Sequence, residues 1–183
     1  MKITAMIAAA LLMTAGAQSK PGNARYVTVY SRNGIVVPFA IRAQAGALAA
    51  DIFAGIGVTL NLRDGNPPAS EAAPIIIEFD DRTPETLLPR AWAYSLPFEG
   101  VHIRIFWDRM CLEEFPYQLL AHVMVHEITH IIQGSDLHAR EGIMNAHWAG
   151  KERWGMGRKP LHFTDADVLL IYQGLDSRRE GIR

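Results

Sequence analysis

The residues of this chain best suited to catalysis lie in one short run, where His126, Glu127 and His130 form the pattern H-E-x-x-H. The surrounding residues 116–133 are mostly apolar and begin with a proline, which predicts a helix. Residues four apart lie on one face of a helix, so the two histidines can bind the same metal ion. The glutamate projects beside them, within reach of a water molecule at the metal. This pattern predicts a zinc site with a general base next to it.

A hydrolytic zinc site needs three protein ligands and one position left open for water. Gly134 predicts the end of the helix, because glycine readily adopts the left-handed conformation that closes many helices. His138 follows closely enough to fold back, and we predict that it is the third ligand. Asp136 is the main alternative, either as a ligand or as an acceptor for a ligand imidazole. Glu141 and Glu152 are further alternatives.

The chain offers other histidines near this run. His122 precedes His126 by one helical turn, but it cannot join the same site, because it lies about 12 Å along the helix from His130. We therefore expect His122 either to have a structural role or to support a metal ligand without binding the metal. His102 and His147 lie in segments that border the predicted site, where a histidine can stabilise a developing oxyanion. A surface position without such a role is the simpler interpretation of both.

The elements that must position these residues include both strand and helix patterns. Their order predicts an α/β fold in a single domain. Residues 84–97 are interrupted by prolines and are predicted to be irregular. The predicted strands cover 25–30, 35–37, 58–62, 74–79 and 101–107, and the predicted helices cover 43–55, 116–133 and a C-terminal segment that begins at Thr164 and stops at Gly174.

The stretch 101–107 alternates strictly, with apolar residues on one face and His102, Arg104 and Phe106 on the other. Such a strand has one packed face and one partly wet face, which is typical of the edge of a sheet. We therefore predict an edge strand immediately before the H-E-x-x-H helix.

Composition limits the classes of function. The chain has 183 residues, of which 49% are hydrophobic and 20% charged, and a formal net charge of −1. These values are typical of one globular domain and give no basis for a nucleic acid or an anionic membrane as partner. Cys111 is the only cysteine, so an internal disulfide is excluded.

The N-terminus is typical of exported proteins. Lys2 precedes an apolar run over 3–13, and Ala15-Gly16-Ala17 supplies an A-x-A cleavage pattern. We predict a signal peptide over 1–17, a mature domain over 18–183 and a secreted or periplasmic location. The apolar run is too short to span a bilayer, so no membrane span is expected in the mature form. The segment before the first strand is too short for an inhibitory pro-domain, and no zymogen is expected.

The run from His126 to His130, with Gly134, His138 and the segment ending at Met144, resembles the metzincin zinc metalloproteases. The signature of that clan is H-E-x-x-H-x-x-G-x-x-H, followed by a methionine turn beneath the zinc. This chain instead has H-E-x-x-H-x-x-x-G-x-x-x-H, with Gln133 at the clan's glycine position and Asp136 at its third histidine.

The resemblance implies a metzincin-like α/β (α+β) fold, a single domain with a mixed twisted sheet, an active-site helix and a C-terminal helix. It implies one catalytic Zn²⁺ bound by His126, His130 and His138, with Asp136 still open as the third ligand. It also implies Glu127 as the base and Met144 in the methionine turn.

The activity implied by the resemblance is that of a zinc-dependent endopeptidase. We expect the protein to be secreted, because of its signal peptide, and monomeric. Its peptide or protein substrate would pair with strand 101–107, near His102 and Arg104. One alternative is a catalytically inactive binding module stabilised by zinc. Another is a secreted domain that binds no metal.

Overall fold

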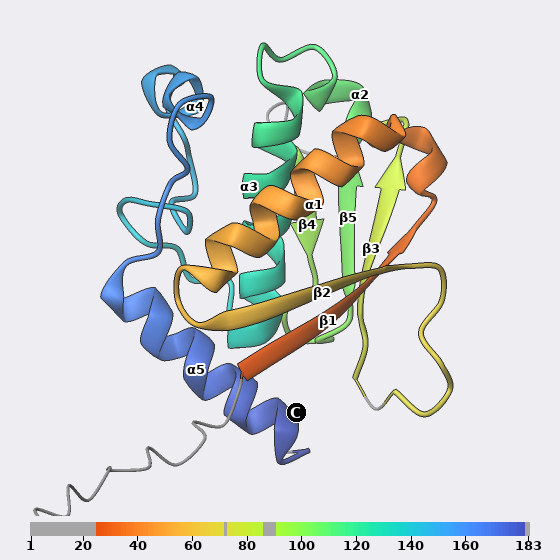
Figure 1. Cartoon of the computed structure of the whole chain (residues 1–183), viewed down its shortest axis with the longest axis vertical. Helices are drawn as coiled ribbons and strands as arrows, with labels where there is room; N and C mark the ends of the chain where they lie inside the picture. Colours follow the sequence, from red (N-terminus) through yellow and green to blue (C-terminus); the bar gives the residue numbers. More distant parts are fainter. Residues whose placement is uncertain (1–24, 72, 86–90, 182–183) are drawn as a thin grey trace, which may run out of the picture.

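The computed structural model describes residues 25–71, 73–85 and 91–181 (Figure 1). The predicted signal peptide over 1–17 lies outside the described residues. A five-stranded sheet has the order β2-β1-β3-β5-β4, and every neighbouring pair is parallel except β5 and β4. Its strands are β1 (Arg25–Arg32), β2 (Val58–Asp64), β3 (Ile75–Asp80), β4 (Ala93–Ser95) and β5 (His102–Phe106).

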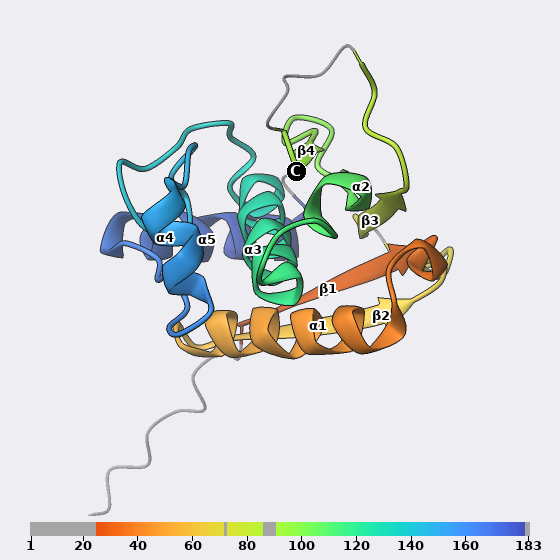
Figure 2. The ribbon, with the colours of Figure 1, turned by 90° about the horizontal axis from the view of Figure 1, so that it is seen from above.

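Helix α3 packs against both α1 and α5 (Figures 1 and 2). The predicted mixed α/β fold in one domain is therefore confirmed. None of the described helices is both long and apolar enough to cross a membrane. The helices are η1 (Gly34–Val36), α1 (Phe39–Ala54), α2 (Trp107–Met110), α3 (Pro116–Gln133), α4 (Gly150–Met156) and α5 (Asp165–Arg179).

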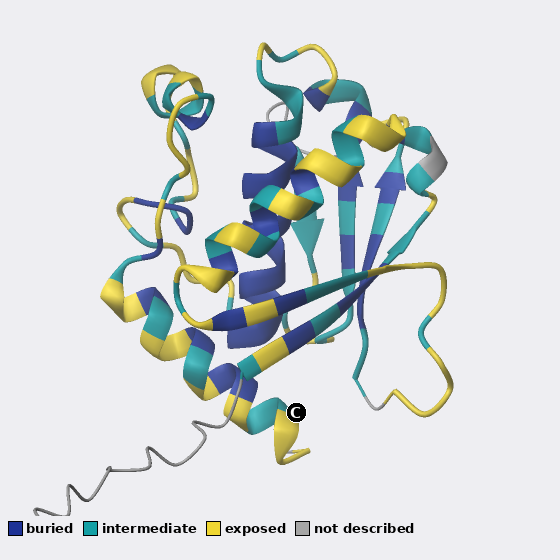
Figure 3. Ribbon diagram, in the orientation of Figure 1, coloured by how far each residue is buried: buried dark blue, intermediate teal, exposed yellow. Residues whose placement is uncertain are grey.

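Helix α3 is the centre of the fold. Every residue from Gln118 to Gln133 is buried, including all the polar ones (Figure 3). A helix that is buried all round must pack against neighbours on every side. Alanine at Ala45 and Ala49 of α1, both fully buried, leaves room for this close packing. The predicted bounds are confirmed, with Pro116 in the first turn and Gly134 in the left-handed conformation, at φ 61°, after the last turn.

The prediction of an edge strand at 101–107 is wrong. This stretch forms β5, which lies between β3 and β4, so β4 is the strand at that edge. Arg104 forms a two-point ion pair with Asp80, at 2.8 and 2.9 Å, and His102 pairs with Glu99. Strand β4 has only three residues, too few to display the period-two pattern from which strands are predicted.

Two smaller predictions also need correction. Residues 34–36 form the 3₁₀ helix η1 where a return strand was expected, and the C-terminal helix does not stop at Gly174 but continues to Arg179. A Cβ at Gly174 would lie 2.1 Å from the carbonyl oxygen of Ile132, so glycine there allows α5 to approach α3 closely. The predicted helix start is confirmed, because the Thr164 hydroxyl accepts from the backbone N–H of Asp167.

Candidate metal centre

Three histidine side chains, which we call the triad, converge beside α3. His126 and His130 project from successive turns of α3, and His138 comes from the loop that follows Gly134. The Nε2 atom of His130 lies 3.0 Å from that of His126 and 3.3 Å from that of His138. All three potential ligand atoms lie within 4.8 Å of one another. Zinc–nitrogen bonds in a tetrahedral site place neighbouring ligand nitrogens roughly 3.3 Å apart, so the spacing fits zinc.

Backbone carbonyls fix the orientation of these imidazoles. Nδ1 of His126 donates to the oxygen of Ile143 and Nδ1 of His130 to the oxygen of Ser135, each at 2.8 Å. The ring of His138 is hydrogen-bonded to the backbone of Asp136. In a neutral imidazole whose Nδ1 carries the proton, Nε2 is a lone-pair acceptor. The Nε2 lone pairs of His126 and His130 therefore face each other, an arrangement that a shared cation stabilises.

A proton does not substitute for that cation. Burial, together with the neighbouring His130, lowers the pKa of His126 to about 3. Burial is also the main cause that lowers the pKa of His130 and of His138, and the carboxylate of Asp136 opposes it in both. At neutral pH the three rings are neutral, which is the form that binds metals.

The alternative ligands lie elsewhere among the described residues. Asp136 acts on the histidines through its charge and its backbone, while the group of side chains close enough to hold an ion contains His138 instead. Glu152 accepts a hydrogen bond from the backbone N–H of Ala149 at 2.8 Å and so caps α4. Glu141 is exposed and does not belong to the group.

The loop after His138 is built to present the Ile143 carbonyl. Gly142 has a φ of 74°, and a Cβ there would lie 2.4 Å from the backbone oxygen of His162. That same oxygen accepts from the N–H of Ile143 at 3.0 Å. Met144 is buried, with 1% of its surface exposed, in the same loop. The loop therefore places Met144 one residue from the acceptor of His126, and its role as a methionine turn stays a prediction.

Glu127 is buried next to the triad and touches the edge strand. Burial raises its pKa to about 7, and a hydrogen bond with the Ser95 side chain opposes that shift. A carboxyl group with a pKa near the working pH is well suited to accept and return a proton. The contact with Ser95 was not predicted, because it depends on the pairing of β4 with β5 and on the packing of β4 against α3.

His122 is satisfied within the core, which confirms its predicted structural role. Its Nδ1 donates to the oxygen of Gln118 at 2.7 Å, and its Nε2 accepts from the N–H of Leu161 at 2.9 Å. Both ring nitrogens are therefore engaged away from the triad.

A pair of tryptophan residues, Trp148 and Trp92, packs next to the triad. The ring of Trp148 lies edge-on to His126, with centroids 5.6 Å apart, and stacks on Trp92 at 6.1 Å. The indole N–H of Trp148 donates to the oxygen of Gly142 at 3.2 Å. Because Trp92 immediately precedes β4, this pair connects the loop after the triad to the edge strand.

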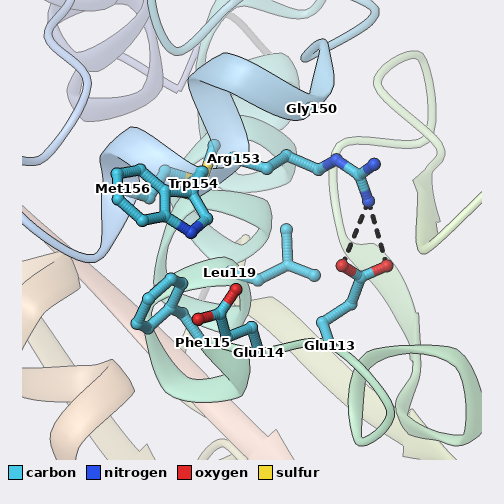
Figure 4. Close-up of a pocket in the computed structure, with 8 residues that line it drawn as sticks. All are labelled: Glu113, Glu114, Phe115, Leu119, Gly150, Arg153, Trp154 and Met156. Carbon is cyan, nitrogen blue, oxygen red and sulfur yellow. Dashed lines mark hydrogen bonds and ion pairs between the residues drawn. The ribbon is translucent and has the colours of Figure 1, made fainter.

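A pocket of about 190 Å³ lies at the N-terminal end of α3, but its lining includes none of the three histidines (Figure 4). One guanidinium nitrogen of Arg153 contacts both carboxylate oxygens of Glu113, at 3.0 and 3.1 Å. Arg153 also lies over the ring of Trp92, 5.5 Å from its centroid. These contacts join α4 to the start of α3 and to the aromatic pair, so we assign them a structural role.

Comparison with known proteins identifies the fold. No protein-family model matches the sequence, and no curated protein matches it. Among solved structures, archaemetzincin from Methanopyrus kandleri superposes with a TM-score of 0.52 at 13% sequence identity. The match covers 86% of this chain and 98% of archaemetzincin. The two proteins therefore share a mixed α/β fold, and the fold expected from the sequence is confirmed.

Proposed function

We propose that this protein is a zinc-dependent endopeptidase whose ion is bound by His126, His130 and His138. The convergence of three imidazole Nε2 atoms beside a buried glutamate carries the proposal. The fold shared with archaemetzincin supports it. Three imidazoles leave one position of a tetrahedral zinc site open, as catalysis requires.

Within this proposal, Glu127 moves the protons. When bound, zinc supplies a Lewis acid that polarises a carbonyl group and activates water. Glu127 accepts a proton as the water oxygen adds to the peptide carbonyl carbon and the carbonyl electron pair moves onto its oxygen. The same carboxyl group then returns the proton to the amide nitrogen as the C–N bond breaks. The products are a carboxylic acid and an amine.

Strand β4 is the proposed guide for the substrate. It is the last strand of the sheet at the edge beside α3, and its Ser95 contacts Glu127. An extended peptide can pair with the free side of such a strand through backbone hydrogen bonds, which brings its carbonyl groups past the base. Export through residues 1–17 and action as a monomer complete the proposal.

Peptide cleavage by the zinc-loaded protein and by Glu127→Gln tests this function. We expect the wild type to cleave members of a peptide library, and Glu127→Gln to retain zinc but lose roughly 10²–10⁴-fold in kcat. A zinc-loaded wild type that cleaves no more peptide than Glu127→Gln would contradict the proposed peptidase activity and favour an inactive zinc-binding module.

A further inference from the structure

The loop between Ala139 and Trp148 is closed on itself near its start and packs against the triad at its end. The N–H of Ala139 donates to the oxygen of Met144 at 2.8 Å, which closes the loop on itself. At the other end Trp148 is held by Gly142 and by its contact with His126. The residue before Trp148 is therefore confined to the neighbourhood of the triad.

That residue is His147, which is exposed. Its backbone N–H donates to the side-chain oxygen of Asn145 at 3.0 Å, while the Asn145 amide donates to the oxygen of Arg140 at 3.3 Å. Its imidazole is close enough to His138 to add to the effect of burial in lowering the pKa of that ring.

The polar side chains of Ser95, Trp148 and His122 are already engaged. The Ser95 side chain hydrogen-bonds with Glu127, and the indole N–H of Trp148 bonds to Gly142. Both nitrogens of His122 are bonded within the core. No residue of the described part of the chain forms a hydrogen bond with the ring nitrogens of His147. Its ring N–H is therefore available to a ligand.

We propose that His147 is a further catalytic residue, whose imidazole N–H donates a hydrogen bond to the oxyanion that forms when a peptide carbonyl is attacked at the triad. This inference rests on the proposed function. In this mechanism, residues of two different elements have different roles. Glu127, on α3 beside β4, accepts the proton of water. His147, on the loop beside His138, stabilises negative charge on the carbonyl oxygen. A donor placed where charge develops lowers the barrier more than it strengthens substrate binding.

The test compares His147→Ala and His147→Gln with wild type, Glu127→Gln and the matched control His162→Ala, which removes another exposed histidine side chain. We expect His147→Ala to lose roughly 10²–10³-fold in kcat with little change in KM. Glutamine keeps an N–H donor and should recover part of that loss. Zinc content, measured by atomic absorption, should match wild type in all of these variants.

A second readout does not depend on turnover. The probe is a phosphinic peptide with the sequence of the best library substrate, whose anionic tetrahedral phosphorus group resembles the attacked carbonyl. Calorimetry should show weaker binding to His147→Ala than to His162→Ala, by a factor similar to the loss in kcat.

The outcomes separate the two proposals. If wild type cleaves peptides and His147→Ala equals it in kcat and in phosphinate affinity, the role of His147 is overturned while the proposed function stands. Loss of zinc from His147→Ala would also overturn it. If zinc-loaded wild type and Glu127→Gln are equally inactive, the proposed function fails and this inference fails with it.

Discussion

His126 donates through Nδ1 to the carbonyl oxygen of Ile143 at 2.8 Å, which ties the central helix to a loop that follows all three histidines. This bond fixes the direction of the Nε2 lone pair, because the proton must sit on Nδ1. The metal-binding capacity of α3 therefore depends on the path of the loop. Acceptors of this kind commonly raise the affinity of a metal site.

The substitution Gly142→Ala tests this dependence. A side chain at φ 74°, with its Cβ 2.4 Å from the His162 oxygen, must displace the loop and with it the Ile143 carbonyl. We expect a loss of roughly 1–3 kcal/mol from backbone strain and weaker zinc binding. Gly150→Ala is the control, because a Cβ there meets nothing within 4 Å. Unchanged zinc affinity in Gly142→Ala would show that the Ile143 acceptor is dispensable.

Removing the hydroxyl of Ser95 is predicted to change the pH dependence of catalysis. The hydrogen bond from Ser95 lowers the pKa of Glu127 against the larger effect of burial. In Ser95→Ala that opposing effect is lost, so the pKa rises and the base is protonated at higher pH. The acidic limb of the kcat/KM profile should move to higher pH, with zinc content unchanged. A limb that stays in place or moves to lower pH would contradict the contact.

The metal-free protein is predicted to lose stability on acidification. Burial lowers the pKa of His122, His126, His130 and His138 in the folded state. The unfolded chain, with histidine pKa values near about 6.5, binds more protons below that pH, so folding weakens as pH falls. Glu127 acts in the opposite direction, because its raised pKa of about 7 favours the folded state on acidification.

Because the four histidines outnumber the single carboxyl group of Glu127, we expect a net loss of folding stability as the pH falls below about 6.5. The measurement is the thermal midpoint of chelator-treated protein between neutral and acidic pH. His126→Gln removes the histidine whose pKa is lowered most, so the thermal midpoint of this variant should depend less on pH. A midpoint that rises steadily on acidification would show that Glu127 dominates.

Local signals allowed the central part of the site to be predicted. Helix α3 has a long apolar run with Pro116 and Gly134 at its ends, and its two histidines follow the helical period, so its bounds and their common face depend on nearby residues alone. The capping contact at Thr164 is local for the same reason. The sequence also placed His138 close enough to return to α3.

What was missed depends on contacts between distant segments. Strand β4 is short and is defined by its pairing with β5, so neither the edge of the sheet nor the contact of Ser95 with Glu127 has a sequence pattern. The stacking of Trp92 on Trp148 likewise joins separate parts of the chain. Glycine can either end a helix or allow two helices to approach closely, and the sequence alone favours the first interpretation for Gly174. Only the packing of α5 on α3 shows that the second is correct.

The most direct measurement of the central claim is the zinc content of the purified protein beside His138→Ala and Asp136→Ala. We predict one tightly held zinc ion in the wild type, retained in Asp136→Ala and lost in His138→Ala, since His138 completes the group of three nitrogens. Zinc lost from Asp136→Ala but kept in His138→Ala would move the third ligand to Asp136. A wild type that holds no zinc after loading would contradict the metal centre itself.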